Sequence, residues 1–294
     1  MNVSLRQLEY FVAIMDEGSF SRAAELLHVT QPGLSHQFQA LERALGVRLI
    51  ERTPRRPRLT PAGRAVMPHA RAALAAGARV ESTAHRVVAE VEAELYVATM
   101  YSHSVGIFPD ALRSWRLTHS GIRVRLFEHR RSATMTAAMV DGQADIAIGP
   151  RPDHWDGYVR SLGFERFTVV TAEDDPVAAG RHTISLVELA DREWVHFTPD
   201  SGLSDILDAA CARAGFTPAV SIRTEQASSA LRLAAAGMGP ALVPENNLPP
   251  HFTGRTAFPV PPVDREITAY SRTPPDDLGE AFVTAIANRL LAVP

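Results

Sequence analysis

Short polar residues recur on one face of a segment that the sequence predicts to be a helix. The face consists of Gln31, Pro32, Ser35, His36, Gln39 and Arg43, which carry a single charge between them. An ordinary solvated helix would place Glu and Lys or Arg four residues apart. Amides, hydroxyls and imidazoles can instead exchange hydrogen bonds with base edges in the major groove of duplex DNA. The alternative is a polar surface helix with no partner.

Arginines gather directly after this segment. Residues 47–52 predict a strand, residues 53–58 a proline-stiffened turn, and the chain returns through Leu59. Arginine in such a hairpin can contact phosphates or enter a minor groove, where the potential is negative. The four arginines at the turn are Arg52, Arg55, Arg56 and Arg58. A solvated hairpin is the alternative, but the helix face and the hairpin together favour DNA.

The charge of the chain is divided unevenly. Residues 1–88 hold twelve arginines and seven acidic residues, a net charge of +5, whereas the rest of the chain carries −8. Between Arg43 and Arg71 there are eight arginines and one acidic residue, Glu51. A basic cluster in an otherwise acidic protein indicates one surface meant for a polyanion.

Three short helices are expected to position these groups. Ser4 with Gln7 forms a capping-box pattern for the first helix, and Ser19 is a cap for the second. Thr30 is a good N-cap for the third, which has Pro32 in its first turn and ends at Gly46. Its inward face consists of Leu34, Phe38, Leu41 and Leu45.

The run TQPGLSHQFQALERALGVRLIERTPRRPRLTPAG, residues 30–63, resembles the DNA-binding domain of LysR-type transcriptional regulators. The preceding SFSRAAELLHVTQP is similar to the second helix and turn of that family. The resemblance implies a winged helix-turn-helix over residues 1–60. It also implies that Gln31, Pro32, Ser35 and His36 lie at the DNA with the arginines in the wing. Ser19, Arg22, Gln39 and Arg43 complete the expected DNA-binding set.

A long helix is expected to follow, over residues 61–88. Its apolar positions recur every three or four residues and are rich in Ala and Gly, so the stripe needs a partner. We expect this stripe to pack against the same helix of a second copy, since LysR-type proteins dimerise there. Packing on the chain's own C-terminal part is the alternative. A twofold dimer would read a pseudo-palindrome with half-sites about 34 Å apart or a multiple of that distance.

The C-terminal two thirds predict α/β architecture with mostly parallel sheets. The resemblance implies an effector-binding domain over 89–294 with two lobes like those of periplasmic binding proteins. Lobe I would comprise 89–162 and 265–294, and lobe II 163–264, with the last helix packed back on lobe I. The expected strands are Leu95–Thr99, Arg123–Phe127, Asp145–Ile148, Phe167–Thr171, Trp194–Phe197, Ala219–Arg223, Ala241–Val243 and Glu266–Tyr270.

Ligands of open α/β sheets bind beyond the carboxyl ends of strands, where loops lead into helices. Residues in those loops are therefore expected to contact a small effector, although each hydroxyl taken alone is also an ordinary helix cap. The expected set is Thr99, Tyr101, Ser102, His103, His129, Gly149, Pro150, Phe197, Thr198, Ser201 and Thr224. Arg130, Arg131 and Arg151 could favour a small organic acid; solvated arginines are the alternative.

The sequence lacks the motifs that are typical of enzymes and metal-binding proteins. The sequence has no Walker loop, nucleophile elbow or metal-spaced Cys/His cluster, so no enzyme, catalytic residue, metal or cofactor is expected. Cys211 is the single cysteine and lies in a helical pattern typical of a buried thiol.

No apolar run reaches about 20 residues and no secretory signal is seen, so a cytoplasmic protein without membrane contact is expected. The expected partners are double-stranded promoter DNA, a small-molecule effector, RNA polymerase and further copies of the chain, as a homodimer or homotetramer.

Overall fold

A computed structural model describes residues 3–51, 56–89 and 94–291. Contacts divide the chain into two compact units, residues 1–93 with 137–143 and residues 94–136 with 144–294. Among the described residues, no helix is both long and apolar enough to cross a membrane.

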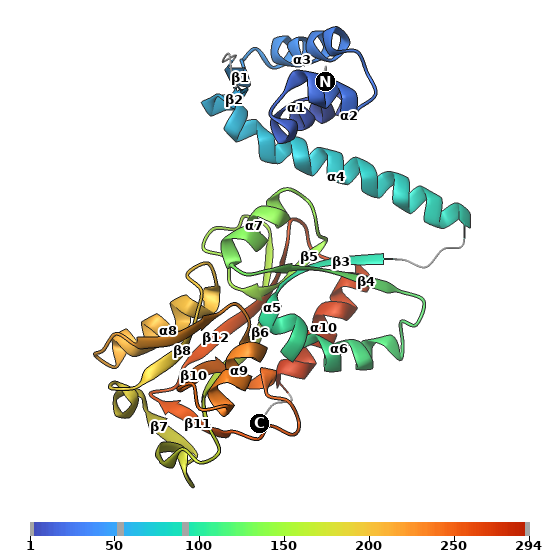
Figure 1. Ribbon diagram of the computed structural model, residues 1–294. Coiled ribbons are helices and arrows are strands. Elements are labelled where there is room, and N and C mark those ends of the chain that lie inside the picture. The colour runs from blue at the N-terminus through green and yellow to red at the C-terminus, as the bar shows by residue number, and fades with distance from the viewer. Residues whose placement is uncertain (1–2, 52–55, 90–93, 292–294) are drawn as a thin grey trace. The chain divides into compact units, whose positions relative to one another are not determined.

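The first unit is a small helical core with a two-stranded wing and one long helix (Figure 1). Its elements are α1 (Leu5–Glu17), α2 (Phe20–Leu26), α3 (Gln31–Leu45), β1 (Ile50–Glu51), β2 (Arg58–Leu59) and α4 (Pro61–Ala89). The expected caps form: Ser4 and Gln7 make a capping box at α1, and Thr30 caps α3. The rings of Phe11 and Phe38 stack at 6.0 Å between centroids and join α1 to α3.

The apolar stripe of α4 is partly used inside this unit. Met67 and Ala70 belong to the core that α1 and α3 form, and a side chain at Gly77 would contact Leu5 of α1. Farther along the helix, Val80 is 70% exposed. The first part of the stripe therefore packs on α1, which the sequence reading did not anticipate.

The second unit has two lobes. The first lobe holds β3 (Glu94–Met100), α5 (Tyr101–Gly106), α6 (Phe108–Arg116), β4 (Arg123–His129), β5 (Ile146–Pro150) and the last helix α10 (Asp277–Leu291); α7 (Ser132–Val140) follows β4. As expected, α10 packs back on this lobe, where Phe282 contacts Phe108 and Trp115. Figure 1 shows α10 beside α6 although about 160 residues separate them.

The second lobe contains β7 (Thr183–Ser185), β8 (Glu193–Phe197), α8 (Gly202–Arg213), β9 (Ala219–Thr224), α9 (Ala227–Ala235), β10 (Ala241–Pro244) and β11 (Arg255–Val260), with the short 3-10 helices η1 (Pro176–Ala178), η2 (Leu186–Leu189) and η3 (Glu245–Asn247). Strands β8 and β9 pair in parallel as a separate sheet. The lobe has its own apolar core, which includes Trp194, Phe197 and Cys211.

Two long strands belong to both lobes, β6 (Tyr158–Thr171) and β12 (Asp264–Ser271). They pair antiparallel in the middle of the strand order β4-β3-β5-β12-β6-β11-β7, and β10 joins β6 from the side. The expectation of mostly parallel sheets is therefore wrong, because both connections between the lobes run through one antiparallel pair. Strands β7 and β11 were not expected at all.

Candidate functional site

Helix α3 presents a polar face to solvent and an apolar face to the core. Leu34, Phe38 and Leu41 are buried. On the opposite side Gln31, Pro32, His36 and Arg43 are exposed, and Ser35 and Gln39 are half-buried. The helix begins where the Thr30 hydroxyl accepts from the Gly33 amide at 3.3 Å. All six residues predicted from the sequence thus lie on one accessible helix.

The wing is fixed to this helix by a carboxylate that sequence reasoning missed. Glu42 Oε1 accepts from the amides of Leu49, at 2.7 Å, and Ile50, at 3.3 Å. At the other end of the wing the Thr60 hydroxyl donates to the Arg48 carbonyl at 2.7 Å. These hydrogen bonds hold the described base of the wing against α3.

The other residues predicted to bind DNA lie in α2 and in the wing. Ser19 caps α2 by accepting from the Arg22 amide at 3.4 Å, and the Arg22 guanidinium donates to the Glu17 carbonyl. Arg56 and Arg58 are exposed in the wing. Arg52 and Arg55 lie outside the described residues. Ser19 is thus occupied as a cap, and Arg22 is held at the base of α2.

A cleft between the two lobes of the second unit leaves about 30 Å³ of free space, enough for about one water molecule, so the lobes must separate to admit a metabolite. It is lined by Met100, Tyr101, Ser102, Val105, His129, Arg130, Ser201, Leu203, Glu225, Gln226, Ala227, Ser228, Asn247 and Arg265. The first residues of α5, α8 and α9 all contribute, and neither α5 nor α9 has a side-chain cap. Helix N-termini carry free N–H groups and partial positive charge, which favour an anion.

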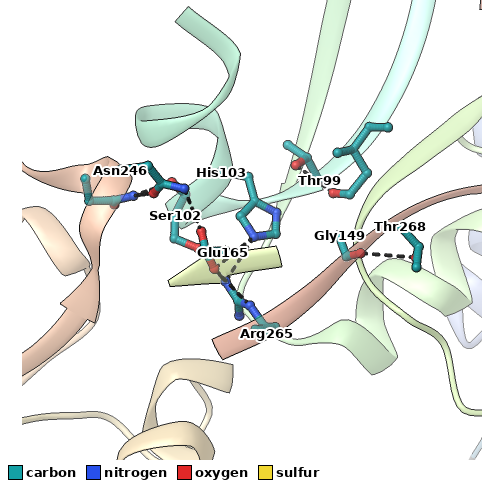
Figure 2. Close-up of polar contacts among 10 residues, drawn as sticks. Thr99, Ser102, His103, Gly149, Glu165, Asn246, Arg265 and Thr268 are labelled. Carbon is teal, nitrogen blue, oxygen red and sulfur yellow. Dashed lines mark hydrogen bonds and ion pairs between the residues drawn. The ribbon is translucent and has the colours of Figure 1, made fainter. Parts of the chain in front are cut away.

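The inner end of the cleft is closed by a buried ionic cluster (Figure 2). Glu165 of β6 and Arg265 of β12 are direct cross-strand partners and form an ion pair. The Arg265 Nη2 atom also donates to His103 Nε2 at 2.9 Å, and to the Ser102 hydroxyl at 3.4 Å. Burial opposes ionisation of Glu165, but Arg265, His103 in its protonated form at acid pH, and Asn246 outweigh it and lower the pKa of Glu165 from 4.5 to about 2. The carboxylate is therefore ionised.

The tautomer of His103 follows from its neighbours. Arginine has no acceptor, so Nε2 must accept from Arg265, and the proton of the neutral ring lies on Nδ1. That Nδ1 atom is buried and has no hydrogen-bond partner among the described residues. Beside the ring, the Asn247 side chain donates to the Ser102 carbonyl at 2.8 Å and ties α5 to η3 of the second lobe.

The outer end of the cleft is bridged by exposed ion pairs. Arg130 pairs with Glu225 at 2.7 Å and with Asp200 at 3.2 Å. Arg131 pairs with Asp205 at 2.7 Å, so arginines of one lobe meet acids of the other. The expectation that these arginines favour a small organic acid stays a prediction; in this structure Arg130 and Arg131 have anionic partners. Arg151 lies 3.9 Å from Glu266.

Four of the eleven predicted effector residues line the cleft: Tyr101, Ser102, His129 and Ser201. Burial lowers the pKa of His129, and its Nε2 atom is buried without a described hydrogen-bond partner. Ser201 caps α8 through the Leu203 amide at 3.3 Å. An unpaired polar atom at the wall of a cleft is a position that a polar ligand could satisfy.

The other predicted residues lie behind the cleft wall or beside it. The Thr99 hydroxyl donates to the Ile148 carbonyl at 2.9 Å, and Gly149 accepts from Thr268 at 3.2 Å (Figure 2). Phe197 is fully buried in the core of the second lobe. The rest are His103 in the ionic cluster, Pro150 at the end of β5, and Thr198 and Thr224, which join β8 to β9 by a backbone hydrogen bond of 3.0 Å.

Sequence reasoning found Arg130 but missed Arg265, the other arginine that lines the cleft. Arg265 was noted only as part of the segment where the chain returns to the first lobe, and Glu165 and Asn247 were not singled out. A signal existed, because Asp264–Glu266 places three charged residues at the start of a strand that is otherwise apolar. No group of three His, Cys, Asp or Glu able to hold a metal occurs within residues 3–51, 56–89 and 94–291.

An exposed polar helix with a wing in one unit, and a cleft between two lobes in the other, accompany matches to two family models that define a DNA-binding transcription regulator with an effector-binding domain. Residues 5–64 match the family model described as "Bacterial regulatory helix-turn-helix protein, lysR family", and residues 89–290 match "LysR substrate binding domain". The chain belongs to the LysR family, whose members are transcription regulators rather than enzymes.

Individual relatives agree with this assignment. The HTH-type transcriptional regulator BenM of Acinetobacter baylyi is 30% identical over 246 residues, which cover 82% of this chain and 80% of BenM. A full-length OxyR variant of Pseudomonas aeruginosa has the same fold, with a TM-score of 0.71 and 22% identity over 97% of this chain and 95% of that one. CbnR in complex with its target DNA gives a TM-score of 0.67 and 24% identity, covering 98% and 100%.

Proposed function

We propose that this regulator reads promoter DNA through α3 and the wing. Gln31, Ser35, His36, Gln39 and Arg43 would meet base edges or nearby phosphates, and the wing arginines would meet the backbone or the minor groove. The support is the accessible polar face of α3 and its hydrogen-bonded connection to the base of the wing through Glu42. Two copies joined along α4 would read a pseudo-palindrome as a dimer or tetramer. We propose further that the protein acts in the cytoplasm and engages RNA polymerase.

We propose that the effector is a small organic acid held in the cleft between the lobes. The observation that carries this proposal is the convergence of three helix N-termini and Arg265 on one cleft. Ser102, Ser201, Ser228 and Gln226 would supply further hydrogen bonds. Met100, Val105 and Leu203 form an apolar part of the wall, so the acid would carry an apolar body.

Two experiments test these functions separately. Binding of duplex promoter DNA should weaken steeply with salt, because phosphate contacts release counterions. Replacing Ser35 or His36 with Ala should relax sequence preference and leave affinity for random duplex DNA nearly unchanged. If the protein ignores its own promoter region at low salt, the DNA-binding proposal fails. For the effector, thermal shifts against a panel of organic acids and matched neutral amides should favour the acids; equal shifts would contradict an anionic ligand.

A further inference from the structure

The buried cluster at the inner end of the cleft is electrically balanced. Glu165 is negative, Arg265 is positive, and His103 is neutral in the geometry described above. The side chains of Glu165 and His103 are fully buried, and that of Arg265 is 11% exposed. A buried charge without a partner is strongly unfavourable, so the balance matters energetically.

One nitrogen of the Arg265 guanidinium group, Nη1, is available to donate a hydrogen bond to a ligand. Its Nε and Nη2 atoms are bonded to Glu165, His103 and Ser102, whereas the described residues supply no hydrogen-bond partner for Nη1. The residue also lines the cleft. A carboxylate entering the cleft would therefore find Nη1 and the Ser102 hydroxyl at its inner end.

A bound carboxylate would upset the charge balance. The cluster and its ligand would together carry −1 in a place largely shielded from water. The ligand would also draw the guanidinium toward itself and weaken its hydrogen bond to His103 Nε2. That atom lies 3.6 Å from Glu165 Oε2 and would then have a free lone pair facing a carboxylate.

We propose that binding of a carboxylate to Arg265 is coupled to the uptake of one proton by His103. The proton comes from solvent and forms an N–H bond at Nε2, and this N–H group, while keeping its proton, donates a hydrogen bond to the Glu165 carboxylate. The cluster with its ligand then returns to zero net charge. This inference rests on the proposed function, because it assigns the acid to one cation and adds a proton to its binding.

The groups around His103 leave few other acceptors for that proton. From β6 it faces Glu165 and from β12 it faces Arg265, while α5 contributes the Ser102 hydroxyl and η3 the amides of Asn246 and Asn247. Glu165 and His129, which lies on β4 at the wall of the same cleft with a buried and unpartnered Nε2, compete with His103 for that proton. Histidine is the side chain suited to changing charge near neutral pH.

Calorimetric titration of the full-length protein with acetate tests the coupling. In two buffers with different heats of ionisation near neutral pH, the wild type should take up about one proton for each acetate bound. Its affinity should rise as pH falls, by up to about tenfold per pH unit. His103→Gln should bind acetate with no proton uptake and no pH dependence. His103→Asn serves the same purpose if the first variant does not fold.

A matched control is His196→Gln, since His196 is equally buried but bonds to Asp208 and Arg223 away from the cleft. This variant should keep the uptake of one proton. Proton uptake that survives in His103→Gln would place the proton on another group, Glu165 or His129, and overturn the proposal. Acetate binding without proton uptake, or no acetate binding, would also overturn it. The proposed function would survive either result if larger acids still gave thermal shifts.

Discussion

The ion pair between Glu165 and Arg265 makes the stability of the effector-binding unit depend on pH in a calculable way. The pKa of Glu165 falls from 4.5 in the unfolded chain to about 2 in the folded one, because Arg265, His103 and Asn246 outweigh the effect of burial. A depressed pKa contributes stability that is complete above pH 4.5 and is lost as pH falls toward 2. Between about pH 5 and about pH 3.5 the linkage relation gives a loss of about 1 kcal/mol from this single carboxyl.

Urea unfolding followed by tryptophan fluorescence can measure this loss. The three tryptophans, Trp115, Trp155 and Trp194, all lie in the second unit, so the signal reports that unit alone. Replacing Glu165 by itself would strand the buried charge of Arg265 and could prevent folding. The informative variant is therefore Glu165→Gln combined with Arg265→Gln, which keeps two hydrogen-bonding amides and removes the titration.

The double variant should lose about 1 kcal/mol less stability than the wild type over that pH interval. Glu193→Gln is the matched control, since Glu193 is exposed at the start of β8 in the same unit and takes part in none of the ion pairs found among the described residues. This control should follow the wild type. If the double variant and the wild type lose the same stability between the two pH values, Glu165 does not hold a depressed pKa and the buried ion pair is wrongly assigned.

Three further predictions address the wing, the link between α5 and η3, and the cysteine. Replacing Arg56 and Arg58 with Ala should weaken binding to all duplex sequences and lower the salt slope by about two, with Arg113→Ala of α6 as an exposed control; an unchanged slope would contradict the wing assignment. Gly106→Ala should weaken effector binding without changing DNA binding, since its methyl group would collide with Asn246 and Asn247; unaltered effector binding would contradict this. Burial raises the pKa of Cys211 to about 12, so the folded protein should resist thiol reagents and peroxide; stoichiometric labelling of the folded protein would refute this.

Local chemistry made the first unit predictable. Ser4 with Gln7, Thr30 with Pro32 and the glycine at position 46 mark helix ends through interactions spanning three or four residues. The eight expected strands of the second unit all exist, but β6 begins at Tyr158 rather than Phe167. Its first half, YVRSLGF, shows no regular alternation of polar and apolar residues and contains Gly163 at φ 130°, so only its buried end at 167–171 looked like a strand.

The sequence predicted which loops form the cleft, but not how the charged residues of the cleft are paired. The rule that loops at strand ends bind ligands found Tyr101, Ser102, His129 and Ser201. It could not find Arg265, whose position depends on its register against Glu165, a partner 100 residues earlier in the chain. Nor could it show that Arg130 would be paired with Glu225 of the other lobe. Such pairings follow from topology rather than from local sequence.

The two ends of the cleft differ in a way that bears on how the protein would open. The outer pairs of Arg130 and Arg131 are exposed and screened by water and salt, so separating them costs little. The inner pair of Glu165 and Arg265 is buried, and breaking it would strand a charge on each strand. Because that pair joins the two strands that connect the lobes, opening should pivot about β6 and β12 and widen the Arg130 end. A ligand that binds Arg265 would act at the pivot, where a small displacement produces the largest movement at the far end of each lobe.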